Sequence, residues 1–420
     1  MSPNKTTTKL FLPCPAGVEA LLAAEVQAIT GRAAESGRGG VWVPGDHATA
    51  MLLNLESRLA TRVLWPLIEG PYRDEHDLYA LARRIGWEQW INPEQTLRVD
   101  VAAMRSPLKS LNFAALRIKD AVCDTLREAS GARPSVDTHR PDLPIALFAG
   151  PDHAALYVDT SGEPLFKRGW REDKGEAPLK ETLAAAMLAA AGWQGRVQDG
   201  PLFDPCCGAG TIIVEAAQIA CGIAPGAQRH FAFERLLPFK PHAAVWRDLQ
   251  RAARARVRAP AAPLFAGDVS FRMTDFASRN AERAGVRQAI DFKTADALQR
   301  MPPTAAGTLM LNPPYGERIA PKGRGSVHRS DDQSRNVSSR EGFEGGGTSA
   351  EFFGSLASHW KRHYAGWTAW LLSPDPKLPT AMRLKESRRV PLWNGPIECR
   401  LFRFDMVAGV NRSPEPPPSA

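Results

Sequence analysis

The chain has 420 residues, of which 44% are hydrophobic and 23% are charged, which fits two or three globular domains with sizeable cores. No apolar run approaches the roughly 20 residues of a membrane helix, and the first residues lack the apolar centre of a signal peptide, so we expect a cytoplasmic protein without membrane contact. The net charge of +8 favours a polyanionic partner such as nucleic acid, although many basic proteins bind none.

The six cysteines give no sign of a metal centre, because they form no C-x-x-C pair and no zinc-ligand spacing. The adjacent Cys206 and Cys207 are either a redox pair or small buried thiols of a reducing compartment. His359 and His363 lie four residues apart, but the glutamate of a zinc protease motif is missing between them. We therefore assign both histidines to a helix surface and expect no bound metal.

Residues 1–65 predict a small α+β subdomain. Short apolar runs predict its strands, and apolar positions three and four apart predict two helices, the first of which Gly31 would cap. The predicted strands are 9–12 and 41–43, and the predicted helices are 18–29 and 48–59.

Residues 66–165 predict a second α+β domain. Its helices are expected at 76–85 and 113–129, and its strands at 97–104, 145–148 and 155–159, the last two as a pair. Four basic residues could follow a phosphate backbone or form a solvated helix face: Arg105, Lys109, Arg117 and Lys119. Trp87 and Trp90 could stack on bases or pack in the core.

Residues 166–408 predict an α/β domain, because strands and helices alternate from Leu179 onward as in a mostly parallel, doubly wound sheet. Helices are expected at 179–191, 211–220, 243–257, 273–284 and 351–363, strands at 202–203, 264–266, 290–292, 308–311 and 367–372, and a hairpin at Asn394-Gly395.

Two stretches of this region lack an apolar period and predict disorder: 321–349, rich in Gly and Ser, and the proline-rich tail 409–420. The arginines between 251 and 258 form either an RNA-facing ridge or a solvated helix end.

A glycine turn follows the predicted strand 202–203 and opens a helix, with the sequence Asp204-Pro205-Cys206-Cys207-Gly208-Ala209-Gly210-Thr211. Gly208 and Gly210 let the backbone turn tightly, and the helix start at Thr211 presents free N–H groups to a pyrophosphate or a carboxylate. The spacing is neither a P-loop nor a complete G-x-G-x-x-G, so the turn alone is weak evidence.

Three aspartates follow three predicted strands: Asp204, Asp268 and Asp296. The first could accept from an ammonium group, the second could hold a ribose diol, and the third could accept from an adenine amino group. Each of them could instead cap a helix or a turn. Three at successive strand ends predict a crevice for an amino-acid nucleoside, S-adenosylmethionine.

The predicted strand 308–311 ends abruptly at Asn312-Pro313-Pro314-Tyr315, because proline lacks an N–H and restricts the residue before it. The Asn312 side-chain oxygen and the Pro313 carbonyl could accept the two hydrogens of a planar amine, while Tyr315 stacks on the ring that carries it. The turn therefore predicts a site for a planar amine, and the predicted S-adenosylmethionine crevice supplies a methyl donor for it.

Together these motifs resemble the THUMP-containing class I methyltransferases, and within them the bacterial enzymes that methylate N2 of a guanine in 23S ribosomal RNA. The likeness covers nearly the whole chain. Residues 11–29 resemble the family's ferredoxin-like start, 66–160 its THUMP module, 165–171 and 177–184 its lead into the catalytic domain, and 394–399 its closing hairpin.

The resemblance implies a Rossmann-like domain with a seven-stranded, mostly parallel sheet, and it implies roles for individual residues. The cofactor would contact Thr182, Asp204, Cys206, Gly208, Gly210, Thr211, Asp268, Val269, Asp296, Ala297 and Asn312, and catalysis would use Asn312, Pro313 and Tyr315. The chain departs from the family pattern at Cys206, where relatives usually carry a larger residue, and in the insert 321–349.

The resemblance thus implies methyl transfer from S-adenosylmethionine to guanine N2 of 23S ribosomal RNA, or of its precursor. The turn at Asn312 is shared with enzymes that methylate adenine N6 or protein glutamine. These substrates, and a guanine of transfer RNA, therefore remain open. A third possibility is an RNA-binding ribosome assembly factor whose methyltransferase fold is vestigial.

Overall fold

The computed structural model describes residues 8–175, 179–313 and 349–407. The chain falls into two compact units whose segments alternate along the sequence. The first unit contains Met1–Trp170, Glu181–Ala186 and Gly222–Arg258, and the second contains Arg171–Lys180, Met187–Cys221 and Ala259–Ala420. No helix among the described residues is long and apolar enough to cross a membrane.

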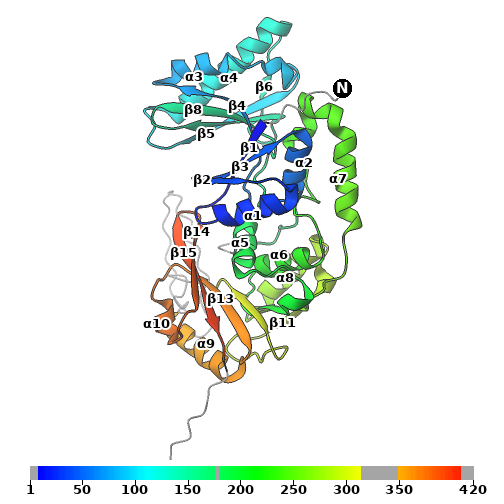
Figure 1. Cartoon of the computed structure of the whole chain (residues 1–420), viewed down its shortest axis with the longest axis vertical. Helices are drawn as coiled ribbons and strands as arrows, with labels where there is room; N and C mark the ends of the chain where they lie inside the picture. Colours follow the sequence, from blue (N-terminus) through cyan, green and yellow to red (C-terminus); the bar gives the residue numbers. More distant parts are fainter. Residues whose placement is uncertain (1–7, 176–178, 314–348, 408–420) are drawn as a thin grey trace, which may run out of the picture. The chain divides into compact units, whose positions relative to one another are not determined.

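The first unit is built on an eight-stranded sheet with the order β2-β3-β1-β4-β8-β7-β5-β6 (Figure 1). This single sheet runs through both α+β regions that the sequence predicts. Its strands are β1 (Thr8–Pro13), β2 (Glu35–Gly37), β3 (Gly40–Gly45), β4 (Leu64–Pro71), β5 (Thr96–Ala103), β6 (Ser135–Val136), β7 (Leu143–Ala149) and β8 (His153–Asp159).

Strand β4 joins the two halves of this sheet, since it pairs antiparallel with β1 and with β8. Sequence analysis did not predict β4, because Pro66 and the terminal Gly70-Pro71 interrupt the alternation typical of a strand. The register shifts between Pro66 and Ile68, as at a bulge.

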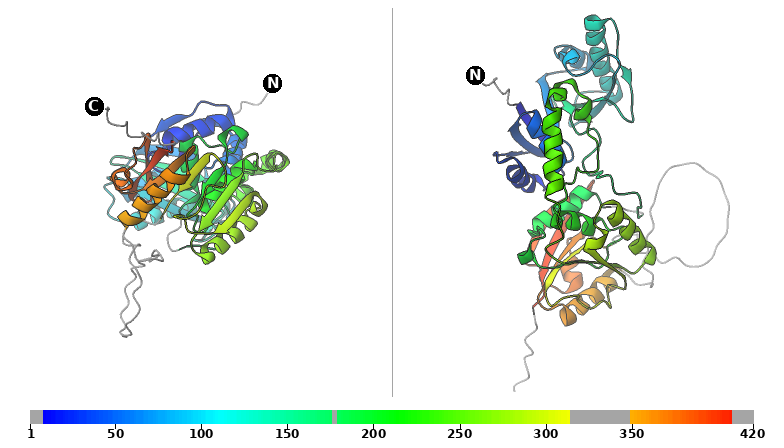
Figure 2. Two further views of the ribbon diagram at one scale, coloured as in Figure 1. Left: turned by 90° about the horizontal axis from the view of Figure 1, so that it is seen from below. Right: turned by 90° about the vertical axis from the view of Figure 1, so that its right-hand side faces the viewer.

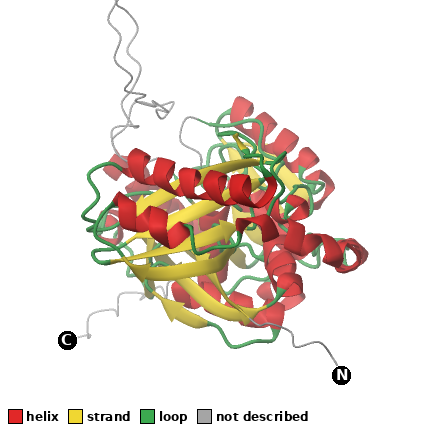
Figure 3. Ribbon diagram, turned by 90° about the horizontal axis from the view of Figure 1, so that it is seen from above, coloured by secondary structure: helices red, strands yellow, loops and turns green. Residues whose placement is uncertain are grey.

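The helices of this unit lie where apolar periodicity predicts them: α1 (Glu19–Thr30), α2 (His47–Glu56), α3 (Glu75–Ala82) and α4 (Leu111–Ser130). Gly31 ends α1 with a left-handed φ of 67°, as expected of a C-cap. Figure 3 shows helices lying across the strands, and both α3 and α4 contact strands of this sheet. Trp87 and Trp90 are buried, which confirms core packing for both rings.

A segment from the middle of the chain completes the first unit. Residues Gly222–Arg258 contain α7 (Ala243–Ala255), which contacts α2. The amide of Gly226 donates to the carbonyl of Leu55, and the amide of Leu237 donates to the carbonyl of Trp90. These contacts group the segment with the first unit, although its sequence lies within the predicted range 166–408.

The second unit contains a seven-stranded sheet with the order β11-β10-β9-β12-β13-β15-β14, which confirms the predicted mostly parallel sheet (Figure 1). Neighbours from β11 to β13 are parallel, and β15 is antiparallel to both of its neighbours. The strands are β9 (Leu202–Asp204), β10 (Leu264–Asp268), β11 (Ile290–Thr294), β12 (Gly307–Leu311), β13 (Trp367–Ser373), β14 (Arg388–Asn394) and β15 (Ile397–Asp405).

The helices of the second unit cover this sheet. Leu309, Met310 and Leu311 of β12 are all buried, so both faces of the sheet are covered. One face packs against α9 through a core that includes Phe203 and Trp360. The helices are α6 (Thr211–Ala220), α8 (Phe271–Arg283), α9 (Ser349–His363) and α10 (Leu378–Met382), with α5 (Glu181–Ala191) shared between the units.

Some sequence-based expectations fall on residues outside this description. Tyr315, residues 321–348 of the predicted insert and the predicted tail from 409 onward lie outside the described residues. Ser349, the last residue of that predicted insert, begins α9.

Candidate active site

The sheet of the second unit reverses its strand order between β9 and β12. β9 comes first in the chain, β10 and β11 continue on one side of it, and β12 and β13 lie on the other. Ligands of open α/β sheets bind outside the carboxyl ends of the strands at such a switch point. Phe203 pairs with Leu309, so Asp204 and Asn312 follow at the same edge of the sheet.

Asp204 is a buried carboxyl group with few donors around it. It is 1% exposed, and its one hydrogen bond from a described residue comes from the Cys206 amide at 3.3 Å. Burial raises the pKa of Asp204 well above its usual range, and the charge of Asp268 raises it further. A buried carboxylate in this setting is stabilised by a cation, such as the ammonium group of a ligand.

The glycine turn between β9 and α6 is closed on one side and open on the other. A Cβ on Gly210, whose φ is 87°, would lie 2.9 Å from the Cβ of Ala277, so this position requires glycine. Gly208 has a φ of 51°, and a Cβ there would have no described atom within 4 Å. The open side leaves room for a ligand next to Thr211, the first residue of α6.

Asp268 and Asp296 lie at the next two strand ends. Asp268 accepts hydrogen bonds from the amides of Gly208 at 3.0 Å and Ser270 at 2.9 Å, and Asp296 accepts from the Leu298 amide at 2.9 Å. Each carboxylate therefore organises the turn that follows its strand. Of the neighbours implied by the resemblance, Val269 is half-exposed and Ala297 is buried.

Two side chains that the sequence analysis missed position the glycine turn. Asn280 of α8 is fully buried, and its amide nitrogen donates to the carbonyls of Ala209 and Asp173, both at 2.9 Å. Arg171 donates to Thr211 Oγ1 at 2.7 Å. An asparagine inside a helix and an arginine in a loop give no sequence signal for such a role, which depends on tertiary contacts.

Asn312 follows β12 with its side-chain oxygen buried and without a hydrogen-bond partner among the described residues. Buried polar atoms are rarely left unsatisfied, so this oxygen is a candidate acceptor for a ligand. Pro313 beside it is buried.

The Oγ1 atom of Thr182 is also buried without a hydrogen-bond partner among the described residues. Because Glu181–Ala186 belong to the first unit, a role for Thr182 in the crevice remains a proposal.

The two adjacent thiols of the turn are partly buried at Cys206 and buried at Cys207, which favours reduced cysteines over a redox pair. Cys206 and Cys207 are both free, and burial raises the pKa of each thiol well above its usual value. Neutral thiols are poor nucleophiles and poor metal ligands. The described residues contain no group of three side chains that could hold a metal ion.

One surface assignment from the sequence is wrong. His359 is only 5% exposed, and its Nε2 atom is 2.8 Å from the carbonyl oxygen of Arg300, so the buried side of α9 includes this histidine. His363 is exposed, as expected.

The basic residues after β5 differ in their surroundings. Arg105 and Lys109 are exposed, whereas the Arg117 guanidinium lies 4.5 Å from the centre of the Tyr79 ring.

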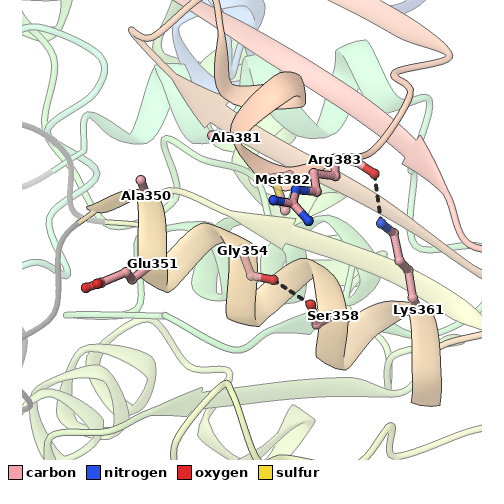
Figure 4. A pocket seen from close by; sticks show the side chains of 8 residues that line it. All are labelled: Ala350, Glu351, Gly354, Ser358, Lys361, Ala381, Met382 and Arg383. Carbon is pink, nitrogen blue, oxygen red and sulfur yellow. Dashed lines mark hydrogen bonds between the residues drawn. The ribbon is translucent and has the colours of Figure 1, made fainter.

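A cavity of about 430 Å³ lies between α9 and α10, away from the predicted site residues (Figure 4). Ser358 donates to the Gly354 carbonyl at 2.8 Å, and Lys361 Nζ donates to the Arg383 carbonyl at 2.7 Å. Because these polar groups bond to one another and none of the strand-end aspartates lines the cavity, we do not assign it to the active site.

Three domain families match consecutive stretches of the chain. They are the RlmL ferredoxin-like domain at residues 9–64, the THUMP domain at 72–159 and the RMKL-like methyltransferase domain at 168–327.

Curated relatives match nearly the whole chain. The Ribosomal RNA large subunit methyltransferase K/L of Syntrophotalea carbinolica is 37% identical over 95% of this chain and 54% of its own length. The protein of the same name from Methylococcus capsulatus is 36% identical over 96% of this chain and 52% of its own length. The chain therefore spans about half the length of the curated relatives it matches.

Solved structures match nearly the whole chain. A possible methylase from Clostridium difficile 630 has a TM-score of 0.80 at 25% identity and covers 99% of this chain and 100% of its own. SMU.472, a putative methyltransferase complexed with SAH, also has a TM-score of 0.80 at 25% identity, covering 95% and 98%. With its three matching domains and its seven-stranded sheet, the chain combines a ferredoxin-like and a THUMP region with an RMKL-like domain of the class I methyltransferase fold.

Proposed function

We propose that this chain transfers a methyl group from S-adenosylmethionine to the exocyclic N2 amine of a guanine in 23S ribosomal RNA. The observation that carries the proposal is the side-chain oxygen of Asn312, which is buried without a hydrogen-bond partner among the described residues, at the switch point that also holds Asp204. The names of the K/L relatives support ribosomal RNA as the substrate. The choice of N2 rests on the resemblance of the motifs.

The residues of the crevice fit S-adenosylmethionine. The buried carboxylate of Asp204 would hold the ammonium group, and the open side of Gly208 with the start of α6 would receive the carboxylate. Asp268 and Asp296 would bind the ribose and the adenine. The cofactor supplies an electrophilic methyl group.

The turn after β12 would position the acceptor amine. A guanine flipped out of its stack would present its N2 group to Asn312 and Pro313, whose side-chain and backbone oxygens accept the two hydrogens. Tyr315 would stack on the base, as its place in the motif implies. The two hydrogen bonds direct the nitrogen lone pair toward the methyl carbon. Such in-line transfer depends on positioning more than on a strong base.

Incubation with radiolabelled S-adenosylmethionine tests this proposal against its alternatives. The protein is given unmodified 23S ribosomal RNA, transfer RNA, DNA and bulk protein separately, and the labelled nucleoside is identified by mass spectrometry. We expect N2-methylguanosine in 23S ribosomal RNA. Label in DNA adenine, in transfer RNA or in protein glutamine would replace the proposed substrate, and RNA binding without label would favour a ribosome assembly factor. We also propose that the reaction takes place in the cytoplasm.

The variant Asn312→Ala separates binding from chemistry. If Asn312 acts on the acceptor amine, the variant keeps its affinity for S-adenosylmethionine within a few-fold. It should lose about 100-fold or more of its turnover, since orientation of the reacting groups supplies several kcal/mol. Equal losses in affinity and turnover would contradict this division of roles.

A further inference from the structure

Helix α7 of the first unit is exposed over most of its surface. Only Trp246 and Ala253 are buried within Ala243–Ala255. Figure 2 shows this helix in green alongside the blue elements of the same unit, and α2 is one of its contacts. A helix with so narrow a buried stripe has more exposed surface than its packing explains.

The exposed surface of α7 and of the residues after it consists mainly of arginines and small apolar residues. Residues 243–258 contain five arginines and one acidic residue, Asp248, in a chain whose net charge is +8. The other exposed positions are alanines and valines. A helix face that only meets solvent usually mixes both charge signs, whereas small residues between arginines allow a polyanion to approach the backbone closely.

The arginines of this stretch differ in their partners. Arg256 pairs with Glu56 and donates to the Gly222 carbonyl, so it holds the segment in place. The side chains of Arg247, Arg254 and Arg258 have no ion pair or hydrogen bond with a described residue. Arg251 pairs with Asp248, but both side chains are more than 60% exposed, so the pair is weak.

Three of these arginines share one face of the helix. Arg247, Arg251 and Arg254 follow the i, i+4, i+7 spacing, so they form a row that we call the α7 arginine row. The row is about 10 Å long at 1.5 Å per residue, and Arg258 extends it beyond the end of the helix. Successive phosphates of a nucleic acid strand are spaced closely enough to contact more than one of these side chains.

The row is held firmly at both of its ends. Before α7, the Gly226 amide bonds to the Leu55 carbonyl, and Arg58 donates to the Ile223 carbonyl. After α7, Arg256 binds Glu56. Because the backbone is fastened to α2 and its neighbours, little further ordering of the helix is needed when the arginines bind a ligand.

We infer that the α7 arginine row binds the phosphate backbone of the RNA substrate. This extends RNA contact of the first unit beyond the matched THUMP residues 72–159, to a helix whose sequence lies within the matched methyltransferase domain. The inference rests on the proposed function in taking RNA as the substrate.

The test measures binding of the full chain to unmodified 23S ribosomal RNA, transcribed in vitro, across a range of salt concentrations. The variant Arg247→Gln/Arg254→Gln removes two unpaired charges of the row. We expect the slope of log affinity against log salt to become shallower by about 1.5, because each phosphate contact contributes roughly 0.7 to 0.9. Affinity for S-adenosylmethionine should not change.

The matched control is Lys9→Gln/Arg38→Gln, which removes two exposed charges from the same unit outside the row. This control should keep the wild-type slope, as should Arg247→Lys/Arg254→Lys, which retains the charges. A wild-type slope in the glutamine row variant, or equal losses in the row variant and the control, would overturn the inference. If the wild-type protein methylates RNA but the glutamine row variant keeps the wild-type slope, only the inference is contradicted. If the wild-type protein binds RNA with a slope that the row variant reduces but does not methylate it, only the proposed function is contradicted.

Discussion

At the scale of single residues, Asp204 has the environment that most clearly calls for a ligand. Burial holds the pKa of its carboxyl group well above the usual range, with a further rise from Asp268 and an opposing hydrogen bond from Cys206. A raised folded-state pKa stabilises the protein most at acidic pH, and this contribution is lost as the pH rises through the folded pKa. An ionised Asp204 therefore opposes folding until a cation binds.

We expect Asp204→Asn to raise the thermal midpoint of the cofactor-free protein at pH 8, with the gain shrinking toward pH 5. The same variant should bind S-adenosylmethionine roughly 10- to 100-fold more weakly, because a charged hydrogen bond contributes about 1.5–3 kcal/mol. Wild-type affinity should fall on acidification, since Asp204 must then release a proton to bind the ammonium group. Thermal unfolding and calorimetric titration between pH 5 and pH 8 measure both effects.

Asp275→Asn provides the comparison for this experiment, because Asp275 lies on α8 with its side chain 46% exposed and pairs with Arg279. It should leave the affinity for the cofactor unchanged. If Asp204→Asn lowers the midpoint equally at both ends of the pH range, burial of an ionised carboxylate is not the source of the raised pKa.

At the scale of elements, the glycine turn and α6 form one rigid part of the crevice. The start of α6 lies against α8, where a Cβ on Gly210 would lie 2.9 Å from the Cβ of Ala277. Any side chain at Gly210 meets both a left-handed backbone conformation and a collision with α8. The position of the free amides of α6 thus depends on one residue without a side chain.

The variant Gly210→Ala should therefore destabilise the second unit by about 2–4 kcal/mol, the combined cost of the left-handed conformation and the overlap. It should also weaken cofactor binding, because the start of α6 must move. Gly192→Ala is the control, since Gly192 has a φ of 75° but open space around its Cβ. Similar losses of stability in the two variants, measured by thermal unfolding, would mean that contact with Ala277 is not limiting.

How well the sequence predicts an element depends on how local its determinants are. The helix predicted at 211–220 matches α6 (Thr211–Ala220), because a glycine turn and apolar period define it locally. The sequence analysis missed β4 because its partners β1 and β8 come from distant parts of the chain and its prolines interrupt the alternation typical of a strand. His359 was misassigned because its burial depends on Arg300, 59 residues away.

The candidate site follows the same rule. The positions of Asp204 and Asn312 at strand ends could be read from motifs, because β9 and β12 end just before a proline-containing turn. Strand β10, in contrast, runs through Gly267 to Asp268. The role of Asn280 could not, since its two carbonyl partners lie more than 70 residues away. The assignment of individual residues to ammonium, ribose and adenine stays a prediction.

At the scale of the whole molecule, the segment Gly222–Arg258 provides part of the hydrophobic core of the first unit. Phe233 is 1% exposed and lies within 5.5 Å, ring centre to ring centre, of Phe231, Phe239 and Trp246. Contacts of this cluster reach β4, because Phe239 also lies 5.9 Å from Trp65. Loss of the Phe233 ring should thus destabilise strands of the first unit that lie far away in sequence.

We expect Phe233→Ala to destabilise the first unit by about 3–5 kcal/mol, as is typical of a buried phenylalanine. Amide hydrogen exchange should become faster in α2 and β4 and stay unchanged in β12 and β13. The control Val257→Ala, which truncates a side chain that is 50% exposed in the same segment, should have little effect. Faster exchange confined to the strands of the second unit would show that the segment belongs there instead.

The alternation of the two units along the chain has a consequence for how such proteins can be recombined. The polypeptide passes between them five times, near residues 170, 180, 186, 221 and 258. An RNA-binding front half with only one crossover point could be exchanged between enzymes as a cassette. Here a chimaera made by a single junction near residue 170 would take α7 from one parent and α2, which α7 contacts, from the other. We therefore expect stable chimaeras to take Glu56 and Arg256 from the same parent, because these two side chains form an ion pair.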